Sequence, residues 1–492
     1  MPCKQYRIGV FFDGTGNSQG IDGDAKSNVA KLFESYLTGE VKKNFIVDKH
    51  YEVGIGTYMD KAAYKEHYIQ RKIDKGYGGG GAKRINHAIE KVCKLLDGHL
   101  YHESEDNKFF KREIDVFGFS RGAAEARDFV NTFHWKKINK NKKYSDVRFN
   151  FIGLFDTVGS FGEAGNDIDY KPRDPLLSDE SDGFRDHDGT ALYAYRRVYT
   201  NEADAKKAEA HLKNLGAKSI FSTYSLGRYY VAAMVSDEGL FEPYNFHLKQ
   251  GINASAKHII HFVAHDEKRY NFPLTNIAGS GGFEYTMLGV HSDIGGGYPD
   301  SMTQELSYHI SAHNTKQRAK ARVQGWSERV NRHMGRVTLY KKRVVSNALS
   351  VVYWHLMYDL AVEKYGLYLQ KPTEAISLEL MPYFAYAKEH LTNAYTYENE
   401  PQGLSLKEKY IHYSSVDVAD IETFNDGNTN VVDLWAEDSP DLIGGNDMRY
   451  VNKITGKRVD ARENRTITKE ELYAKREIYE NKHSLAITVK QR

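Results

Sequence analysis

The sequence predicts an α/β protein with a mostly parallel sheet flanked by helices. Short, nearly continuous apolar runs cover residues 7–14, 114–119 and 147–155, and such runs are typical of strands that are buried on both faces. Between them lie segments with helical periodicity, such as 81–96. Strands that alternate with helices favour a parallel sheet, because each helix forms the crossover to the next strand.

Further elements follow in chain order. We expect a second strand in 45–57, and short apolar runs return at 257–269 and 284–298. Residues 303–370 are expected to be helical, with Lys and Arg on one side, including Lys316, Arg318, Lys320 and Arg322. The most apolar window, 344–362, contains Ser346, Asn347, His355 and Asp359, which favours a buried helix over a membrane span.

Composition excludes several classes of protein. The 492 residues include 68 Lys and Arg against 66 Asp and Glu, so the net charge of +2 argues against nucleic-acid binding through bulk charge. Two cysteines, Cys3 and Cys93, exclude a disulfide framework and a zinc–thiolate cluster. The 35 tyrosines are many for this length; tyrosines such as Tyr353 could face lipid, with ordinary core and surface positions as the alternative.

The length permits one large domain with insertions, or two to three ordinary ones. We expect the α/β core over 1–302, and it carries an insertion at about 163–250, where the pattern loosens. A helical lid region over 303–400 and a mixed C-terminal region over 401–492 follow.

The strongest local motif is GFSRG, residues 118–122, which follows an apolar strand and opens an Ala-rich helix. This context is that of a nucleophile elbow, in which a strained turn presents a serine above the sheet. Gly118 and Gly122 allow the strand and the helix to approach, and the helix N-terminus places N–H groups near Ser120.

A nucleophilic serine needs a base and an acid that orients the base. Asp156 ends the strand that follows the elbow, where sites gather in parallel sheets. His291 precedes a glycine-rich loop that can aim its ring. The order Ser120, Asp156, His291 is that of α/β-hydrolases, with His265 and His412 as alternative bases.

An oxyanion hole requires backbone N–H groups near the nucleophile. One is expected from Arg121, and the other from the loop after the first strand, at Gly14 or Thr15. Asp13 is expected to orient that loop.

No metal or cofactor site is predicted, although an irregular calcium site in the acidic stretch 179–189 stays open. The glycine-rich segment 76–83 fails the P-loop pattern because Ala82 precedes Lys83. His258, His261 and His265 fall in a run that favours a strand, which would scatter their side chains.

Five motifs occur in order: FFDGTGN, GFSRGAAEAR, FDTVGS, AHDEKR and GVHSDIGGGY. Together they resemble the α/β-hydrolase domain of type VI secretion phospholipase effectors of the group-one type, over residues 8–415. The resemblance implies phospholipase A chemistry with Ser120, Asp156 and His291 as the triad, and Asp293 lies in the last motif as a supporting residue.

The resemblance also implies delivery to the periplasm or membrane of another cell, a secretion-apparatus partner and a cognate immunity protein. The N-terminal residues fit no signal peptide, so we expect synthesis in the bacterial cytoplasm. An esterase of small soluble esters and a non-catalytic interaction module remain the alternatives.

Overall fold

The fold is taken from a computed structural model of the chain. It describes residues 4–18, 25–57, 81–98, 109–161, 170–172, 184–185, 191–214, 217, 219–225, 227–236, 241–251, 254–267, 269, 272–313, 315–323, 325–331, 336–392, 406, 409–412, 450–452, 458–459, 472–474 and 478–479.

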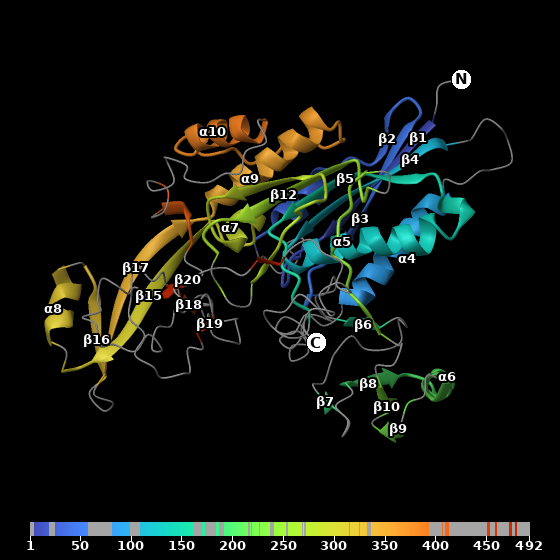
Figure 1. The fold of residues 1–492 in the computed structure, drawn as a ribbon, viewed down its shortest axis with the longest axis horizontal. Helices are drawn as coiled ribbons and strands as arrows, with labels where there is room; N and C mark the ends of the chain where they lie inside the picture. Colours follow the sequence, from blue (N-terminus) through green and yellow to red (C-terminus); the bar gives the residue numbers. More distant parts are fainter. Residues whose placement is uncertain are drawn as a thin grey trace.

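The centre of the molecule is a seven-stranded sheet in the order β14-β12-β5-β4-β1-β3-β2 (Figure 1). All neighbours are parallel except β2, which runs antiparallel to β3 at one edge. The predicted α/β class is confirmed. The strands are β1 (Lys4–Phe12), β2 (Gly39–Lys42), β3 (Phe45–Glu52), β4 (Phe109–Phe119), β5 (Val147–Phe155), β12 (His258–Ala264) and β14 (Phe283–Met287).

Helices cover both faces of this sheet, because successive strand side chains point to opposite faces. Phe11 and Phe117 stack with ring centroids 4.9 Å apart on the face covered by α1, α9 and α10, whereas Val10 and Val116 face α4 and α5 (Figure 1). The helical segments of the core are α1 (Asn28–Ser35), α4 (Gly81–Gly98), α5 (Arg121–Phe133), η2 (His134–Ile138), η3 (Lys142–Tyr144), α7 (His291–Gly295), α9 (Ala348–Asp359), η5 (Leu360–Lys364) and α10 (Met381–Thr392).

The expected insertion contains a separate four-stranded sheet in the order β7-β8-β10-β9. Helix α6 packs on it around a small apolar core that includes Leu212 and Val231. This unit therefore buries its own hydrophobic side chains. Its elements, with the neighbouring two-stranded sheet, are β6 (Tyr170–Pro172), β7 (Phe184–Arg185), β8 (Ala191–Tyr199), α6 (Glu202–Asn214), β9 (Ser219–Ser225), β10 (Arg228–Ser236) and β11 (Phe241–Pro243).

The prediction of helix throughout 303–370 is wrong for the first part of that range. A long antiparallel pair, β15 (Ser301–Ser311) and β17 (Arg336–Ser346), projects from the core with β16 (Ser327–Asn331) beside it (Figure 1). Buried and more exposed residues alternate around Val337 and Leu339, which is the period of a strand. We call β15, β16, β17 and the intervening α8 (Thr315–Val323) the arm.

The basic residues expected on one helical side all lie on α8, but they do not form a uniform patch. Arg318 and Arg322 both pair with Glu328 of β16, at 2.7 and 2.8 Å. Lys316 and Lys320 are exposed. The arm therefore uses half of this charge to hold α8 against its own sheet.

Helix α9 is buried, as the apolar window predicts. Among the described residues, no helix is both long and apolar enough to cross a membrane. The lipid-facing role suggested for Tyr353 is wrong, because its side chain is fully buried and its hydroxyl donates to the Leu288 carbonyl at 2.5 Å. Hydrogen bonding explains how a tyrosine can occupy the core.

Only short pieces of the C-terminal region fall within the described residues. They form a three-stranded sheet, and the C-terminal strand β21 pairs with β13, which lies within the range 1–302. The proposed division at 302 and 400 stays a prediction. The strands are β13 (Leu274–Thr275), β18 (Tyr450–Asn452), β19 (Arg458–Val459), β20 (Leu472–Ala474) and β21 (Ile478–Tyr479).

Candidate active site

Ser120 occupies the turn between β4 and α5. Its φ of 58° and ψ of −129° are strained values for a residue other than glycine. A Cβ on Gly118 would lie 2.6 Å from the Cα of Ala123, and one on Gly122 would lie 2.3 Å from the Asp13 carbonyl oxygen. The two glycines thus permit the close approach of strand, helix and neighbouring loop that the GFSRG motif predicts.

Asp156 follows β5 directly and also has a positive φ, 43°. Its N–H donates to the Phe262 carbonyl at 2.7 Å, which ties it to the neighbouring strand β12. Its Oδ1 accepts the Ala264 N–H at 2.8 Å, and its Oδ2 accepts the Nδ1–H of His291 at 2.5 Å. The carboxylate is fully buried, so these bonds fix its orientation toward the imidazole.

His291 begins α7, and its ring contacts two aromatic side chains. The Phe119 ring is 4.7 Å away, centroid to centroid, and the Phe272 ring is 4.9 Å away. Because Phe119 immediately precedes Ser120, this contact places the imidazole beside the elbow. Burial lowers the pKa of His291 below its usual value, and the bond to Asp156 opposes that shift only in part.

The backbone around His291 is held by acidic side chains of the AHDEKR motif. The His291 N–H donates to Glu267 Oε2 at 3.2 Å, and Gly289 N–H donates to Asp266 Oδ2 at 2.8 Å. Arg269 pairs with the buried Glu267 carboxylate at 2.8 Å. The role of Asp266, Glu267 and Arg269 in supporting His291 was not predicted from the sequence. The local signal for this role was the run of charged residues that directly follows an apolar segment.

Asp13 hydrogen-bonds to the loop that follows β1. Its carboxylate accepts the Gly14 N–H at 2.7 Å and the Tyr51 hydroxyl at 2.5 Å, and burial raises its pKa to about 6. The N–H of Gly14, one of the two candidate donors expected from this loop, is therefore engaged by the Asp13 carboxylate. The Thr15 N–H donates to no described residue, while its hydroxyl accepts from Arg121 Nε at 2.7 Å.

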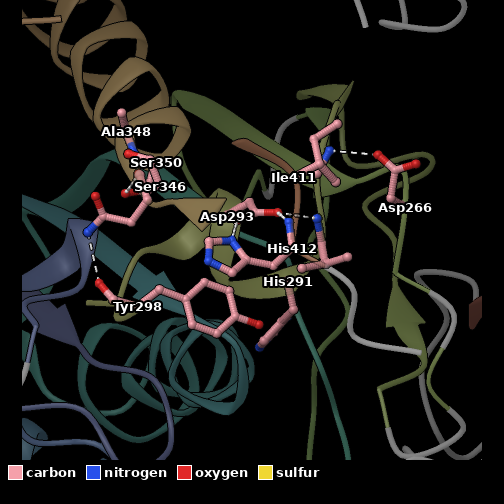
Figure 2. A network of polar contacts seen from close by, with 12 residues as sticks. Asp266, His291, Asp293, Tyr298, Ser346, Ala348, Ser350, Ile411 and His412 are labelled. Atoms are coloured by element: carbon pink, nitrogen blue, oxygen red, sulfur yellow. Dashed lines mark hydrogen bonds and ion pairs between the residues drawn. The ribbon is translucent and has the colours of Figure 1, made fainter. Parts of the chain in front are cut away.

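Asp293 and His412 form a second Asp–His pair, shown in Figure 2. The Nδ1–H of His412 donates to Asp293 Oδ1 at 2.6 Å, and the His412 N–H donates to Oδ2 at 3.0 Å. Asp293 Oδ2 also accepts the Val290 N–H at 3.0 Å, which stabilises the first turn of α7. The Tyr298 ring stacks on the His412 imidazole at 4.0 Å.

The remaining candidates are separate from this region or lie outside the described residues. His258 and His261 lie on β12, and His261 contacts Glu284 at 2.9 Å, so the strand separates their side chains as expected. His265 contacts Asp266 at 3.3 Å. Most of the glycine-rich segment 76–83 and of the acidic stretch 179–189 lies outside the described residues.

The strained serine follows β4, the buried carboxylate follows the adjacent strand β5, and the imidazole that bonds this carboxylate follows β14 at the edge of the same sheet. Such a constellation can support acyl transfer, since the imidazole can accept a proton while the carboxylate holds its tautomer. The interpretation agrees with the position of sites at the carboxyl ends of strands in open α/β sheets.

Residues 6–134 and 128–315 match the family described as the type VI secretion system phospholipase effector Tle1-like catalytic domain. A solved Tle1 effector bound to the VgrG spike of the type 6 secretion system is 18% identical with a TM-score of 0.53, covering 97% of this chain and 94% of that one. An uncharacterized protein from Pseudomonas aeruginosa gives 18% identity and a TM-score of 0.36, covering 78% of this chain and 49% of that one.

No curated protein matches the chain. The likeness to the solved Tle1 effector extends over nearly the whole fold, and the family match spans the strands and loops that carry Ser120, Asp156 and His291. The chain therefore belongs to the Tle1-like family of type VI secretion system phospholipase effectors.

Proposed function

We propose that the protein is a serine-dependent phospholipase of the A type, which cleaves acyl esters of membrane glycerophospholipids. The observation that carries the proposal is the 2.5 Å bond between Asp156 and the imidazole of His291, whose ring also contacts Phe119 beside Ser120. Membership of a phospholipase effector family supports a lipid substrate.

In this mechanism, Ser120 Oγ attacks the acyl carbonyl carbon while His291 Nε2 takes the serine proton. Asp156 keeps the proton of His291 on Nδ1 and stabilises the imidazolium that forms. The protonated imidazole then gives its proton to the departing glycerol oxygen, which leaves an acyl-enzyme. Water attacks that ester with His291 again as the base, and releases the fatty acid.

Negative charge on the carbonyl oxygen requires donors placed before reaction. We assign them to the backbone N–H groups of Arg121 and Thr15. Arg121 follows the serine and begins α5, where the helix dipole favours negative charge. Its side chain also donates to the Thr15 hydroxyl, so one contact joins the two segments that supply the donors.

The test is hydrolysis of vesicles made of phosphatidylethanolamine and phosphatidylglycerol, with fatty acid and lysophospholipid as the measured products. Wild type should release both and react with a fluorophosphonate probe, and Ser120→Ala should do neither. Ser145→Ala, at an exposed serine on the protein surface, is the matched control and should behave as wild type. Probe labelling with turnover of short soluble esters alone would favour the small-ester alternative.

We further propose that the chain engages a secretion-apparatus component of the spike type and a cognate immunity protein. The related effector was solved on a VgrG spike, and its fold is shared over nearly the full chain. Co-purification of this chain with a spike protein encoded in the same genome tests the first partner. Suppression of vesicle hydrolysis by a co-encoded protein tests the second.

A further inference from the structure

A histidine–glutamate cluster outside the proposed active site joins β3 to α4. His50 and Glu52 are two residues apart on β3 and so share one face of the strand, while His87 comes from α4. His50 Nε2 and His87 Nδ1 each lie 2.6 Å from the same oxygen, Glu52 Oε1. The three potential ligand atoms all lie within 4.8 Å of one another.

The carboxylate in this cluster is buried, with 7% of its side-chain surface exposed. Within the described part of the chain, its ion-pair partners are the two imidazoles, and no Lys or Arg pairs with it. A buried carboxylate is costly unless a cation or several donors compensate its charge. Here two imidazole nitrogens converge on one carboxylate oxygen. Together these three groups have the donor atoms of a metal centre.

We propose that His50, Glu52 and His87 bind a divalent first-row transition ion of the zinc class. Two imidazole nitrogens and one carboxylate suit this class, whereas magnesium and calcium prefer all-oxygen sites. Ligand distances of about 2.0–2.2 Å place donor atoms roughly 3.3–3.6 Å apart in a tetrahedral site. The present 2.6 Å separations need only small outward shifts of the two rings to admit the ion.

The exposure of the three side chains gives the ion a route to the site. The His87 side chain is 48% exposed, against 14% for His50, so the α4 side of the cluster faces solvent. Three protein ligands leave a fourth position for water, as in open zinc sites. The ion therefore bridges β3 and α4 through Glu52 and His87, which are 35 residues apart in sequence.

The cluster also lies at the end of β3 that supports the Asp13 loop. The Asp13 N–H donates to the Glu52 carbonyl at 3.1 Å, and Tyr51 donates to the Asp13 carboxylate. On α4, Arg84 Nε donates to the Val53 carbonyl at 2.9 Å. A metal ion here stabilises the junction of β3, α4 and the Asp13 loop.

The experiment is titration of the metal-stripped full chain with Zn²⁺ and, separately, with Co²⁺. Wild type should bind one ion per chain, with the visible absorption of four-coordinate Co²⁺ and a Tm that rises with Zn²⁺ concentration. His87→Ala and Glu52→Gln should each weaken binding at least ~10-fold and abolish the Tm rise. Neither readout uses lipid, so the result is independent of the proposed hydrolase activity.

The matched control is His265→Ala. His265 is also half-exposed and also contacts a carboxylate, Asp266, and no second histidine of the described part of the chain forms an ion pair with Asp266. The control should retain wild-type affinity and stoichiometry. Circular dichroism identifies any variant that fails to fold. If His87→Ala does not fold, the near-isosteric Glu52→Gln still tests the proposal. Absence of saturable binding to wild type, or equal affinity in wild type and both folded cluster variants, overturns the proposal.

Discussion

The two Asp–His pairs contain the same side chains and nearly the same Nδ1–carboxylate bond, yet their surroundings differ. In the Asp156–His291 pair, the ring contacts Phe119 and Phe272 near the carboxyl ends of strands of the central sheet. In the Asp293–His412 pair, the ring is fully buried against Tyr298, and no described residue hydrogen-bonds its Nε2 (Figure 2).

An Asp–His bond therefore does not by itself identify a catalytic base. The first pair adjoins the strained Ser120 turn, whereas the second joins residue 412 to the first turn of α7. Because α7 begins with His291, the second pair can position the first without taking a proton from substrate. We expect Asp156–His291 to act in chemistry and Asp293–His412 to act in stability.

The largest expected effect separates the two histidines directly. His291→Ala should lower kcat for phospholipid hydrolysis by roughly 10⁵–10⁶, because Ser120 would lose its base. His412→Ala, compared at a temperature where both variants are folded, should retain most activity. The measurement is fatty-acid release from vesicles under saturating substrate. Loss of activity in His412→Ala with retention in His291→Ala would reverse the assignment.

Substitution of the two aspartates should distinguish the two pairs in the same way, but the loss of activity should be smaller than for the histidines. Asp156→Asn should lower kcat by roughly 10⁴, because the amide favours the wrong imidazole tautomer. Asparagine tolerates the positive φ of residue 156, so the backbone should be kept. Asp293→Asn is the control, and steady-state kinetics with melting curves measure both. Equal losses of activity without a change in Tm would contradict the comparison.

Stability should respond to the second pair. His412→Leu should reduce the free energy of unfolding by about 1–3 kcal/mol, because Asp293 would lose the bond to Nδ1. His412→Asn should recover part of this loss, since its side-chain N–H can replace Nδ1–H. Chemical denaturation measures the difference. Equal stability of the leucine and asparagine variants would exclude the hydrogen bond as the cause.

The smallest expected effect is on pH dependence. Burial lowers the pKa of His291, and only the neutral imidazole can accept the serine proton. Activity should therefore be complete at neutral pH, and kcat/KM should fall only as pH drops below the ordinary histidine value of about 6.5. Vesicles of phosphatidylcholine keep the substrate charge constant during the profile. A fall in kcat/KM that already begins above about pH 6.5 would contradict burial as the main influence on the pKa of His291.

Local sequence patterns predicted the parts of the fold in which neighbours in sequence determine structure. The region around GFSRG predicts a strand, a turn and a helix. An apolar run, two glycines and an Ala-rich segment follow one another there. Asp156 and His291 were predicted from their places after apolar runs, and the structure brings their side chains together. Their roles in catalysis remain predictions.

Other features depend on contacts that no short window contains. The arm was expected to be helical because its many Lys and Arg residues mask the alternation around Val337 and Leu339. Glu52 and His87 meet only when α4 packs on β3, and the His-x-Glu spacing at 50–52 was the single local signal. Glu267 likewise supports His291 across a long sequence separation.

The bond between Asp293 and His412 also has a consequence for the order of biosynthesis. A ribosome completes the serine, the acid and the base of the proposed triad well before it adds residue 412. Until then, the nascent chain lacks the backbone N–H and the imidazole of His412, which both hydrogen-bond to the Asp293 carboxylate in α7. The loop that carries His291 therefore acquires its full set of native contacts only late in translation, after the central sheet has been synthesised.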